Sequence, residues 1–176
     1  MEAASTAGLL DVLTIERPEQ LKALGHPLRL RVLEVLGGRP AEQLTNRELA
    51  ARLGVDPGHL HFHVRMLLKA GLVALASERR GREKPYRAVA HSIRVAPELL
   101  SSGLTSDVHS AMLDKVQRGL SLFAPEGKFR SAQVTVQIPL ERAIELMTEF
   151  VEHARDLDEL DQDPVVITAF VHPGDR

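Results

Sequence analysis

The sequence contains no cysteine, no tryptophan and one tyrosine among its 176 residues, and aromatic residues make up only 3% of it. The absence of cysteine excludes disulfide bonds, thiolate metal sites and cysteine nucleophiles. No apolar run approaches the roughly 18 residues of a membrane span, and the N-terminus lacks the features of a signal peptide. We therefore expect a cytoplasmic protein without membrane contact, whose core is built from Leu, Val, Ala and Ile.

The net charge of −2 conceals an uneven distribution of charge along the chain. Residues 1–95 hold 15 Lys and Arg against 10 Asp and Glu, a balance of +5. Residues 96–176 hold 7 against 14, a balance of −7. This asymmetry indicates that the first half is suited to a polyanion, the alternative being two solvated surfaces of unequal charge.

The first part of the chain predicts an arm followed by two helices. Residues 1–16 carry only a short apolar run, and we expect them to form an arm. One helix is expected from Pro18 to Gly25 and a second over 27–36, with Pro27 at its first position, where a missing N–H costs least. Apolar residues fall at helical spacing in the second segment, which predicts that it packs on one side.

The next segment has the features of a helix-turn-helix unit. Thr45 and Glu48 form the sequence signature of a capping box, which predicts a short helix over 46–53. Gly54 follows at the position where a tight turn between helices requires a positive φ. A longer helix is expected over 57–70, capped by an aspartate and started by a proline. Two helices joined by so short a turn define the motif.

A basic hairpin is expected directly after these helices. Residues 72–76 and 85–90 have the pattern of two strands, and the tip between them, in 78–85, contains a turn glycine, Gly81. Its cations repel one another unless an anion or solvent screens them, which suits phosphate binding; the alternative is a solubilising loop. We interpret the hairpin as a wing whose basic residues contact DNA, namely Arg79, Arg80, Arg82 and Lys84.

The helix over 57–70 has one side for the core and one for DNA. Leu60, Val64 and Leu67 are spaced to form its inward side, which leaves polar and aromatic residues facing outward near its start. Such side chains can read base edges in the major groove, whereas the alternative is an amphipathic helix that packs on another protein. The predicted DNA-binding residues outside the wing are Arg47, Pro57, Gly58, His59, His61, Phe62 and Arg65.

Three stretches resemble ArsR-type winged-helix repressors. The run from Leu21 to Leu33 resembles the second-helix signature of this family, as does the stretch from Leu53 through Val73. The stretch from Gly81 to Arg87 resembles the family's wing. The resemblance covers about residues 18–92, and it implies a dimeric winged-helix regulator that binds a pseudo-palindromic operator, usually as a repressor.

Many regulators of this type release DNA when a metal binds, but the family's metal ligands are incomplete in this chain. The cysteine sites are absent. Another family site has the form Asp-x-His, followed by ten further residues and then His-x-x-His or His-x-x-Glu. Asp107 and His109 match its opening, but Leu120 occupies the position of the next ligand and does not bind metal. We therefore predict no metal site of this type and no cofactor.

Two further groups of metal-binding residue types are weighed against simpler interpretations. His59 and His63 lie four residues apart on one helical side, but His61 points elsewhere and no carboxylate lies beside them. We favour DNA-facing or structural histidines. The second group, in the C-terminal half, consists of Glu149, His153 and His172. These side chains converge only if the last predicted strand packs beside the preceding helix, and we favour the interpretation that they are solvated.

The C-terminal half predicts a helix-strand-helix-strand module. A helix is expected over 106–123, a half-buried strand over 132–138, a helix from Pro139 and a nearly all-apolar strand over 165–171. Because a two-fold interface joins identical surfaces, the stripe of the first helix is a candidate for dimerisation. The stripe consists of Val108, Met112, Val116, Leu120 and Phe123.

The predicted fold class is α+β, mostly α. Residues 1–95 are assigned to a winged helix-turn-helix domain and residues 96–176 to a module for dimerisation and for an unidentified small-molecule or protein effector. We predict a transcriptional regulator that binds double-stranded DNA as a homodimer; the alternative is a winged-helix module used only for protein contacts. An enzyme is not expected, because no nucleophile–base pair, phosphate-binding glycine loop or complete metal set is present.

Overall fold

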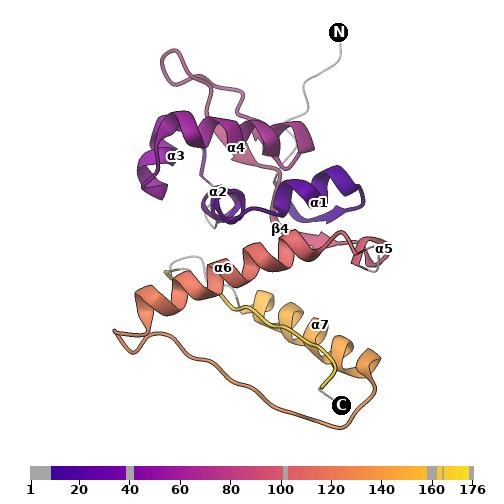
Figure 1. Cartoon of the computed structure of the whole chain (residues 1–176). Helices are drawn as coiled ribbons and strands as arrows, with labels where there is room; N and C mark the ends of the chain where they lie inside the picture. The colour runs from indigo at the N-terminus through magenta and orange to yellow at the C-terminus, as the bar shows by residue number, and fades with distance from the viewer. Residues whose placement is uncertain (1–8, 39–41, 101–102, 158–161, 164, 175–176) are drawn as a thin grey trace. The chain divides into compact units, whose positions relative to one another are not determined.

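The computed structural model describes residues 9–38, 42–100, 103–157, 162–163 and 165–174, and Figure 1 shows its elements. The chain forms two compact units, residues 1–115 and residues 116–176. This division falls inside a helix, whereas the functional division at residues 95 and 96 stays a prediction. The described residues are mostly helical with two small sheets, so the α+β class with a predominance of helix is confirmed.

The helices and the hairpin predicted for the N-terminal unit are present and make up a winged helix-turn-helix. Each predicted helix begins and ends within two residues of its expected bounds. The turn glycines that end two of them, Gly54 and Gly71, have the expected positive φ of 66° and 73°. The elements are α1 (Pro18–Leu24), α2 (Pro27–Gly37), α3 (Asn46–Leu53), α4 (Pro57–Ala70), β2 (Val73–Leu75) and β3 (Tyr86–Ala88).

The core of this unit lies where α4 packs against the three preceding helices and β2. The antiparallel pair β2–β3 is extended by a bridge between Leu44 and Tyr86, which exchange two backbone hydrogen bonds. Leucine and valine dominate the core, as the scarcity of aromatics predicts. Side chains with no exposed surface include Leu21, Val32, Leu36, Leu49, Leu60, Val64 and Leu67.

The N-terminal arm predicted for residues 1–16 is wrong over its second half. Residues 10–15 form a strand, β1 (Leu10–Ile15), which pairs in parallel with β4 (Ala90–Val95). The residues that pair between the two strands are some 80 positions apart in the sequence, as Leu10 and Ala90 are. Parallel strands are not joined by a hairpin turn, so no turn residues in the sequence indicate that they pair. Residues 10–15 were for this reason predicted to be part of an arm.

A short helix, α5 (Pro97–Leu100), precedes α6 (Ser106–Phe123), which matches its predicted bounds. The start of α6 packs closely on the turn after α1, because a Cβ placed on Gly25 would lie 2.6 Å from the Cβ of Asp107. Val108 is only 8% exposed and belongs to the protein's own core, with Met112 half-buried against it. These two members of the predicted dimerisation stripe are therefore used within the chain.

The C-terminal unit contains the predicted helix but neither predicted strand. The helix α7 (Leu140–Asp156) is present. Residues 132–138 and 165–171 form no β-strand, and Figure 1 draws both as plain chain. The prediction of two strands is wrong for these residues. A strand needs a hydrogen-bonded neighbour, and these segments have none among the described residues.

A lipid bilayer sets a minimum length and apolarity for a helix that crosses it. None of the helices among the described residues meets both requirements.

Candidate nucleic-acid interface

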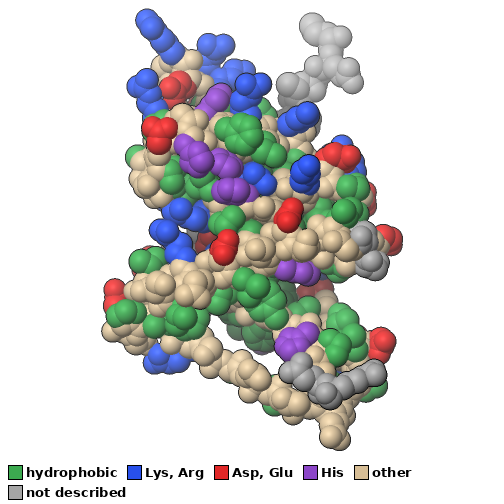
Figure 2. Space-filling model, in the orientation of Figure 1, with side chains coloured by type: hydrophobic (Ala, Val, Ile, Leu, Met, Phe, Trp, Pro, Cys, Tyr) green, Lys and Arg blue, Asp and Glu red, His purple; other side chains and the backbone are tan. Residues whose placement is uncertain are grey.

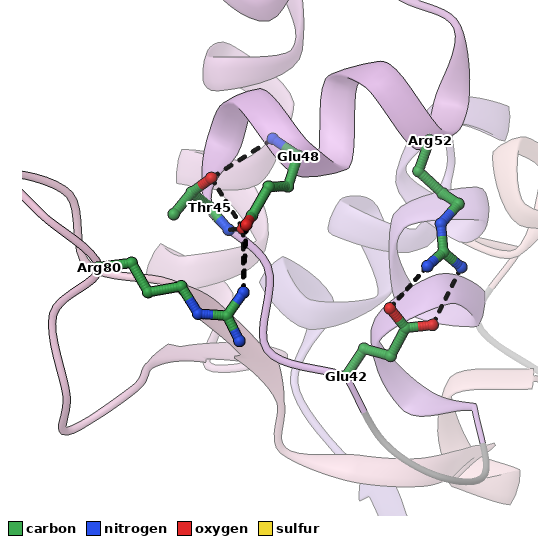
Figure 3. A network of polar contacts seen from close by, with 5 residues as sticks. All are labelled: Glu42, Thr45, Glu48, Arg52 and Arg80. Carbon is green, nitrogen blue, oxygen red and sulfur yellow. Dashed lines mark hydrogen bonds and ion pairs between the residues drawn. The ribbon is translucent and has the colours of Figure 1, made fainter.

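The start of α3 is held by the predicted capping box, shown in Figure 3. The Thr45 hydroxyl accepts a hydrogen bond from the backbone N–H of Glu48 (3.3 Å), and the Glu48 carboxylate accepts one from the backbone N–H of Thr45 (2.8 Å). The hydrogen bonds that the Glu48 carboxylate accepts from the backbone N–H and, at 3.0 Å, from the hydroxyl of Thr45 lower the pKa of this carboxyl. Arg52 binds both carboxylate oxygens of Glu42 (3.0 and 2.8 Å), which joins the end of α3 to the segment before it.

The start of α4 is fixed by two further hydrogen bonds. Asp56 is the N-cap, and its carboxylate accepts from the backbone N–H of His59 (2.8 Å). The Asn46 amide donates to the carbonyl of Pro57 (2.8 Å), so the first residue of α3 is joined to the first residue of α4. A Cβ on Gly58 would lie 3.1 Å from the Asp56 carboxylate, which explains the small residue at this position. The N-terminus of α4 is thereby presented at the surface in a defined position.

The two sides of α4 divide as the spacing predicts. Leu60, Val64 and Leu67 have no exposed surface. Phe62 lies on the other side with 63% of its surface exposed, a large apolar side chain left in solvent. The outward residues predicted to read DNA are all exposed, namely Pro57, Gly58, His59, His61, Phe62 and Arg65.

A buried histidine supports this outward side from below. His63 is 4% exposed, and its ring lies 4.8 Å from that of His59 and 5.5 Å from that of Phe62, measured between centroids. On its other side the ring of His26 lies at 4.3 Å. Desolvation first, and then the charges of His26, His59 and Arg29, lower the pKa of His63 to about 4. His63 is therefore neutral at physiological pH and serves as packing for the base of the outward side.

Arg29 lies beside His63 and joins three helices. Its guanidinium donates to the carbonyls of Lys22 (3.1 Å) and Ala23 at the end of α1, and Nη1 lies 3.5 Å from Nδ1 of His63. Arg29 is only 6% exposed, and this burial lowers the pKa of its guanidinium. Carbonyls at a helix C-terminus lack partners within the helix and favour a cation, which explains a charged group at this depth.

The wing is a hairpin whose tip carries the predicted cations. Arg80 and Glu83 exchange backbone hydrogen bonds around Gly81, which has a φ of 64°. Arg79, Arg80, Arg82 and Lys84 are all exposed. Figure 2 shows Lys and Arg side chains gathered over the wing, with histidines over the neighbouring helices.

Two of the predicted cations are paired with carboxylates. Arg80 binds the Glu48 carboxylate at 3.2 Å, as Figure 3 shows, and Arg47 lies 3.5 Å from the Glu83 carboxylate. Both pairs are well exposed, and exposed ion pairs contribute little to stability because solvent screens them. They hold the wing beside α3 without preventing a phosphate oxygen from replacing the carboxylate.

The remaining wing cations differ from these two. In the part of the chain that the structure describes, no carboxylate lies within ion-pair distance of Arg79, Arg82 or Lys84. Three like charges on one hairpin, together with the N-terminus of α4, create a field that favours anions.

Two hollows lie between the wing and the helix pair. One, of about 300 Å³, is lined by Asn46, His61, Leu75, Glu83, Lys84 and Tyr86. The other, of about 480 Å³, is lined by Thr45, Arg47, Glu48, Arg80, Arg82 and Glu83. Both contain predicted DNA-binding residues; the first is bordered by α3, α4 and the hairpin, and the second by α3 and the hairpin alone.

Three residues of this region were missed by the sequence analysis. Asn46 links the two helices, and its buried Oδ1 has no hydrogen-bond partner among the described residues. His26 and Arg29 form the support below α4. Arg29 could have been found as a charged residue on the buried side of a helix, between Leu28 and Val32. An analysis of the spacing of apolar residues alone does not consider it.

The histidines and acids of the described residues do not form a metal site. No group of three or more of these side chains, among the residues described, is placed to hold a metal ion. The histidines near α4 contact one another through their rings rather than converging on a point.

Comparison with known proteins identifies the N-terminal motif. A helix-turn-helix domain family matches residues 24–76, which confirms the predicted motif, whereas no curated protein matches the chain.

Similar solved structures include winged-helix regulators, at TM-scores too low to carry an argument. The homodimeric winged helix-turn-helix DNA-binding domain Mb0332 from Mycobacterium bovis, described as a possible ArsR-family transcriptional regulator, is 17% identical (65% of this chain, 85% of that one, TM-score 0.36). Rv0081 from M. tuberculosis is 26% identical (58% and 87%, TM-score 0.35). The MarR family protein Rv2887 from Mycobacterium tuberculosis is 21% identical (77% and 84%, TM-score 0.30).

Proposed function

We propose that this chain is a sequence-specific DNA-binding transcriptional regulator, a repressor that binds a pseudo-palindromic operator as a dimer. The observation that carries the proposal is the outward side of α4, where Phe62 and Arg65 stand exposed while Leu60 and Val64 are buried. A side of this kind, at the start of the second helix of a helix-turn-helix domain, is suited to the major groove.

In this proposal α4 reads bases. Arg65 donates to guanine, and His61 donates to or accepts from purine edges. Phe62, which is 63% exposed, contacts thymine methyl groups and so loses its exposed surface on binding. The N-terminus of α4, near Gly58, approaches a backbone phosphate.

The wing and α3 position the protein on the DNA backbone. Arg79, Arg82 and Lys84 contact phosphates directly, because they have no competing carboxylate among the described residues. Arg80 and Arg47 exchange their carboxylate partners for phosphate oxygens. Phosphate contacts carry little sequence information, so these residues set affinity while α4 sets preference.

The short reach of one α4 supports the dimer of this proposal. A recognition helix contacts only a few base pairs through its first turns, and two half-sites one helical turn apart supply the remaining specificity. The proposal therefore predicts two copies of the chain on one operator. A reporter gene with the operator overlapping its promoter should fall in expression when the chain is produced and recover when the chain is removed.

The first test separates phosphate contacts from net charge. Replacing Arg79 and Arg82 by Ala should weaken binding to every duplex and reduce the log–log salt slope of the dimer by about 3.6, roughly 0.9 for each of the four phosphates that its two copies no longer neutralise. The matched control replaces Arg118 and Arg142 of the C-terminal unit, which changes the net charge equally. Equal effects from the two variants would contradict the proposal, as would a wild-type chain that binds no duplex at low salt.

The second test isolates base reading. Arg65→Ala or His61→Ala should relax preference at particular base pairs, measured on a library of operator variants. The expected size is about 1–3 kcal/mol for each bidentate hydrogen-bonded pair that the substitution removes. Lys69→Ala, on the same helix but near its C-terminus, is the control and should leave the preference unchanged. A uniform loss of affinity across the library would show that α4 contacts only phosphates.

A further inference from the structure

The C-terminal unit lacks a core of its own. Every fully buried hydrophobic side chain in the described residues belongs to residues 1–115, and no described residue of 116–176 is buried. Large apolar side chains on α7 and on both extended segments are exposed, such as Ile144 (45%), Phe150 (47%), Val134 (80%), Val165 (84%) and Ile167 (59%). Exposure of this kind in an ordered segment indicates a surface that is covered by something else.

The amount of apolar surface matches a protein interface. Seventeen large hydrophobic side chains of this unit are at least 37% exposed. With on the order of 60 Å² left open on each, one copy presents about 1,000 Å² of apolar surface. A stable interface buries about 800 Å² on each partner, so this unit has enough exposed apolar surface to form one.

The backbone of the unit also has unused hydrogen-bonding groups. Residues 132–138 alternate apolar and polar side chains, and residues 165–171 are nearly all apolar, both patterns being typical of strands. Neither segment makes a backbone hydrogen bond to another described residue. Only another polypeptide segment supplies a ladder of donors and acceptors, so a small molecule does not complete this surface.

The charges of α7 leave its apolar side open to self-association. Leu140, Ile144, Met147 and Val151 are spaced four, three and four residues apart along one side of the helix. The acids Glu141, Glu145, Glu149 and Glu152 occupy a different side. Two copies can therefore meet through the apolar side without bringing these carboxylates together.

We propose that a second copy of this chain covers the apolar face of residues 116–176, with residues 132–138 and 165–171 completed as sheet by the same segments of that copy. The inference rests on the dimer of the proposed function and assigns that dimer a surface. A second copy is present wherever the chain is, and it carries the same unpaired segments, so the contact is self-complementary about a two-fold axis.

The first experiment measures the self-association of the full-length chain by sedimentation over a wide range of concentrations. The wild type should be a dimer, and Val136→Glu should weaken the dimer at least tenfold, because a charge is placed in the centre of the interface. The matched control is Thr135→Glu, which places the same charge on the other side of the same segment and should change the dimer constant by less than about threefold.

The second experiment does not depend on a destabilising variant. The chain has no cysteine, so Glu126→Cys, at an exposed position outside both segments, creates a single labelling site. A spin label there should give one distance between copies in the dimer, and dilution should remove it. Amides of residues 133–137 and 165–171 should exchange slowly in the dimer and rapidly after dilution.

Several results would overturn the inference. These are a chain that is monomeric at all concentrations, equal effects of Val136→Glu and Thr135→Glu, or amide protection independent of concentration. A chain that associates only with a foreign protein would do the same. A chain that dimerises through this surface but ignores DNA contradicts the proposed function alone, whereas a monomer that binds duplexes with a steep salt slope contradicts only this inference.

Discussion

The N-terminal and C-terminal units contain similar amphipathic helices but bury them differently. In α4, Leu60, Val64 and Leu67 have no exposed surface. In α7, Ile144 and Val151 follow the same spacing and remain 45% and 44% exposed. The difference shows that an apolar stripe produces a core only when other elements close around it, as the neighbouring helices and β2 close around α4.

The largest expected difference between the units comes from matched leucines. Leu67→Ala in α4 should lower the free energy of unfolding by about 3–4 kcal/mol, because it opens a cavity in a closed core. Leu140→Ala in α7, at 42% exposure, should cost about 1 kcal/mol or less in dilute solution.

Chemical denaturation checks the leucine pair. Tyr86 is the single tyrosine and is buried in the N-terminal unit, so its fluorescence reports that unit, and helical circular dichroism reports α7 as well. Equal costs in dilute solution would show that the C-terminal unit has a core of its own. A cost at Leu140 that rises with concentration would indicate the second copy.

Buried and exposed arginines give the next contrast. Arg29→Met should cost about 3 kcal/mol, because it removes the charge-assisted hydrogen bonds to the carbonyls of Lys22 and Ala23, and only the Lys22 carbonyl keeps a further donor, the backbone N–H of Gly25. Arg142→Met in α7 breaks exposed ion pairs to Glu145 and Glu149 and should cost much less, because solvent screens both pairs. Thermal unfolding followed by tyrosine fluorescence and circular dichroism measures both, and similar costs would remove the structural role assigned to Arg29.

The pH dependence of stability should reside in the N-terminal unit. The folded pKa of His63, about 4, lies below its ordinary value of 6.5, so the unfolded chain binds more protons between these pH values. The free energy of unfolding therefore has its full value above pH 6.5 as far as His63 is concerned. It falls by at most about 3 kcal/mol as the pH is lowered toward 4. His63→Asn should flatten this dependence, measured by denaturant titration at a series of pH values. An unchanged slope for His63→Asn would assign the effect to other groups.

Helix caps provide the smallest contrast. Thr45→Ala removes the cap of α3 and should lower stability by about 1 kcal/mol. The N-cap position of α7 is Pro139, which makes no side-chain cap, so Pro139→Ser should stabilise α7 by about 0.5–1 kcal/mol. Denaturant titrations monitored as above check both signs, and a loss of helix on Pro139→Ser would contradict the second.

Features encoded by neighbouring residues were predictable, and long-range pairings were not. The capping box at Thr45 and Glu48, the turn at Gly54 and the division of α4 all appear as predicted. The strand β1 was missed, since its partner β4 lies some 80 residues away and a parallel pair has no turn between its strands.

The candidate site was predictable from spacing as far as exposure. Every predicted DNA-binding residue is exposed, and their contacts with DNA stay predictions. The pairing of Arg80 with Glu48 and of Arg47 with Glu83 was not foreseen. Neither was the support of α4 by His26 and Arg29, because these contacts join residues that are close only after the helices pack.

Local patterns in this chain were enough to define its helices, its wing and the outward side of α4, because capping, turn formation and amphipathic spacing act over a few residues. Packing alone settled which apolar stripes are buried and which strands are paired. Burial and strand pairing depend on contacts between residues that are distant in the sequence, which local patterns do not specify. Val64 is buried in a core and Val165 is exposed, although both belong to apolar segments.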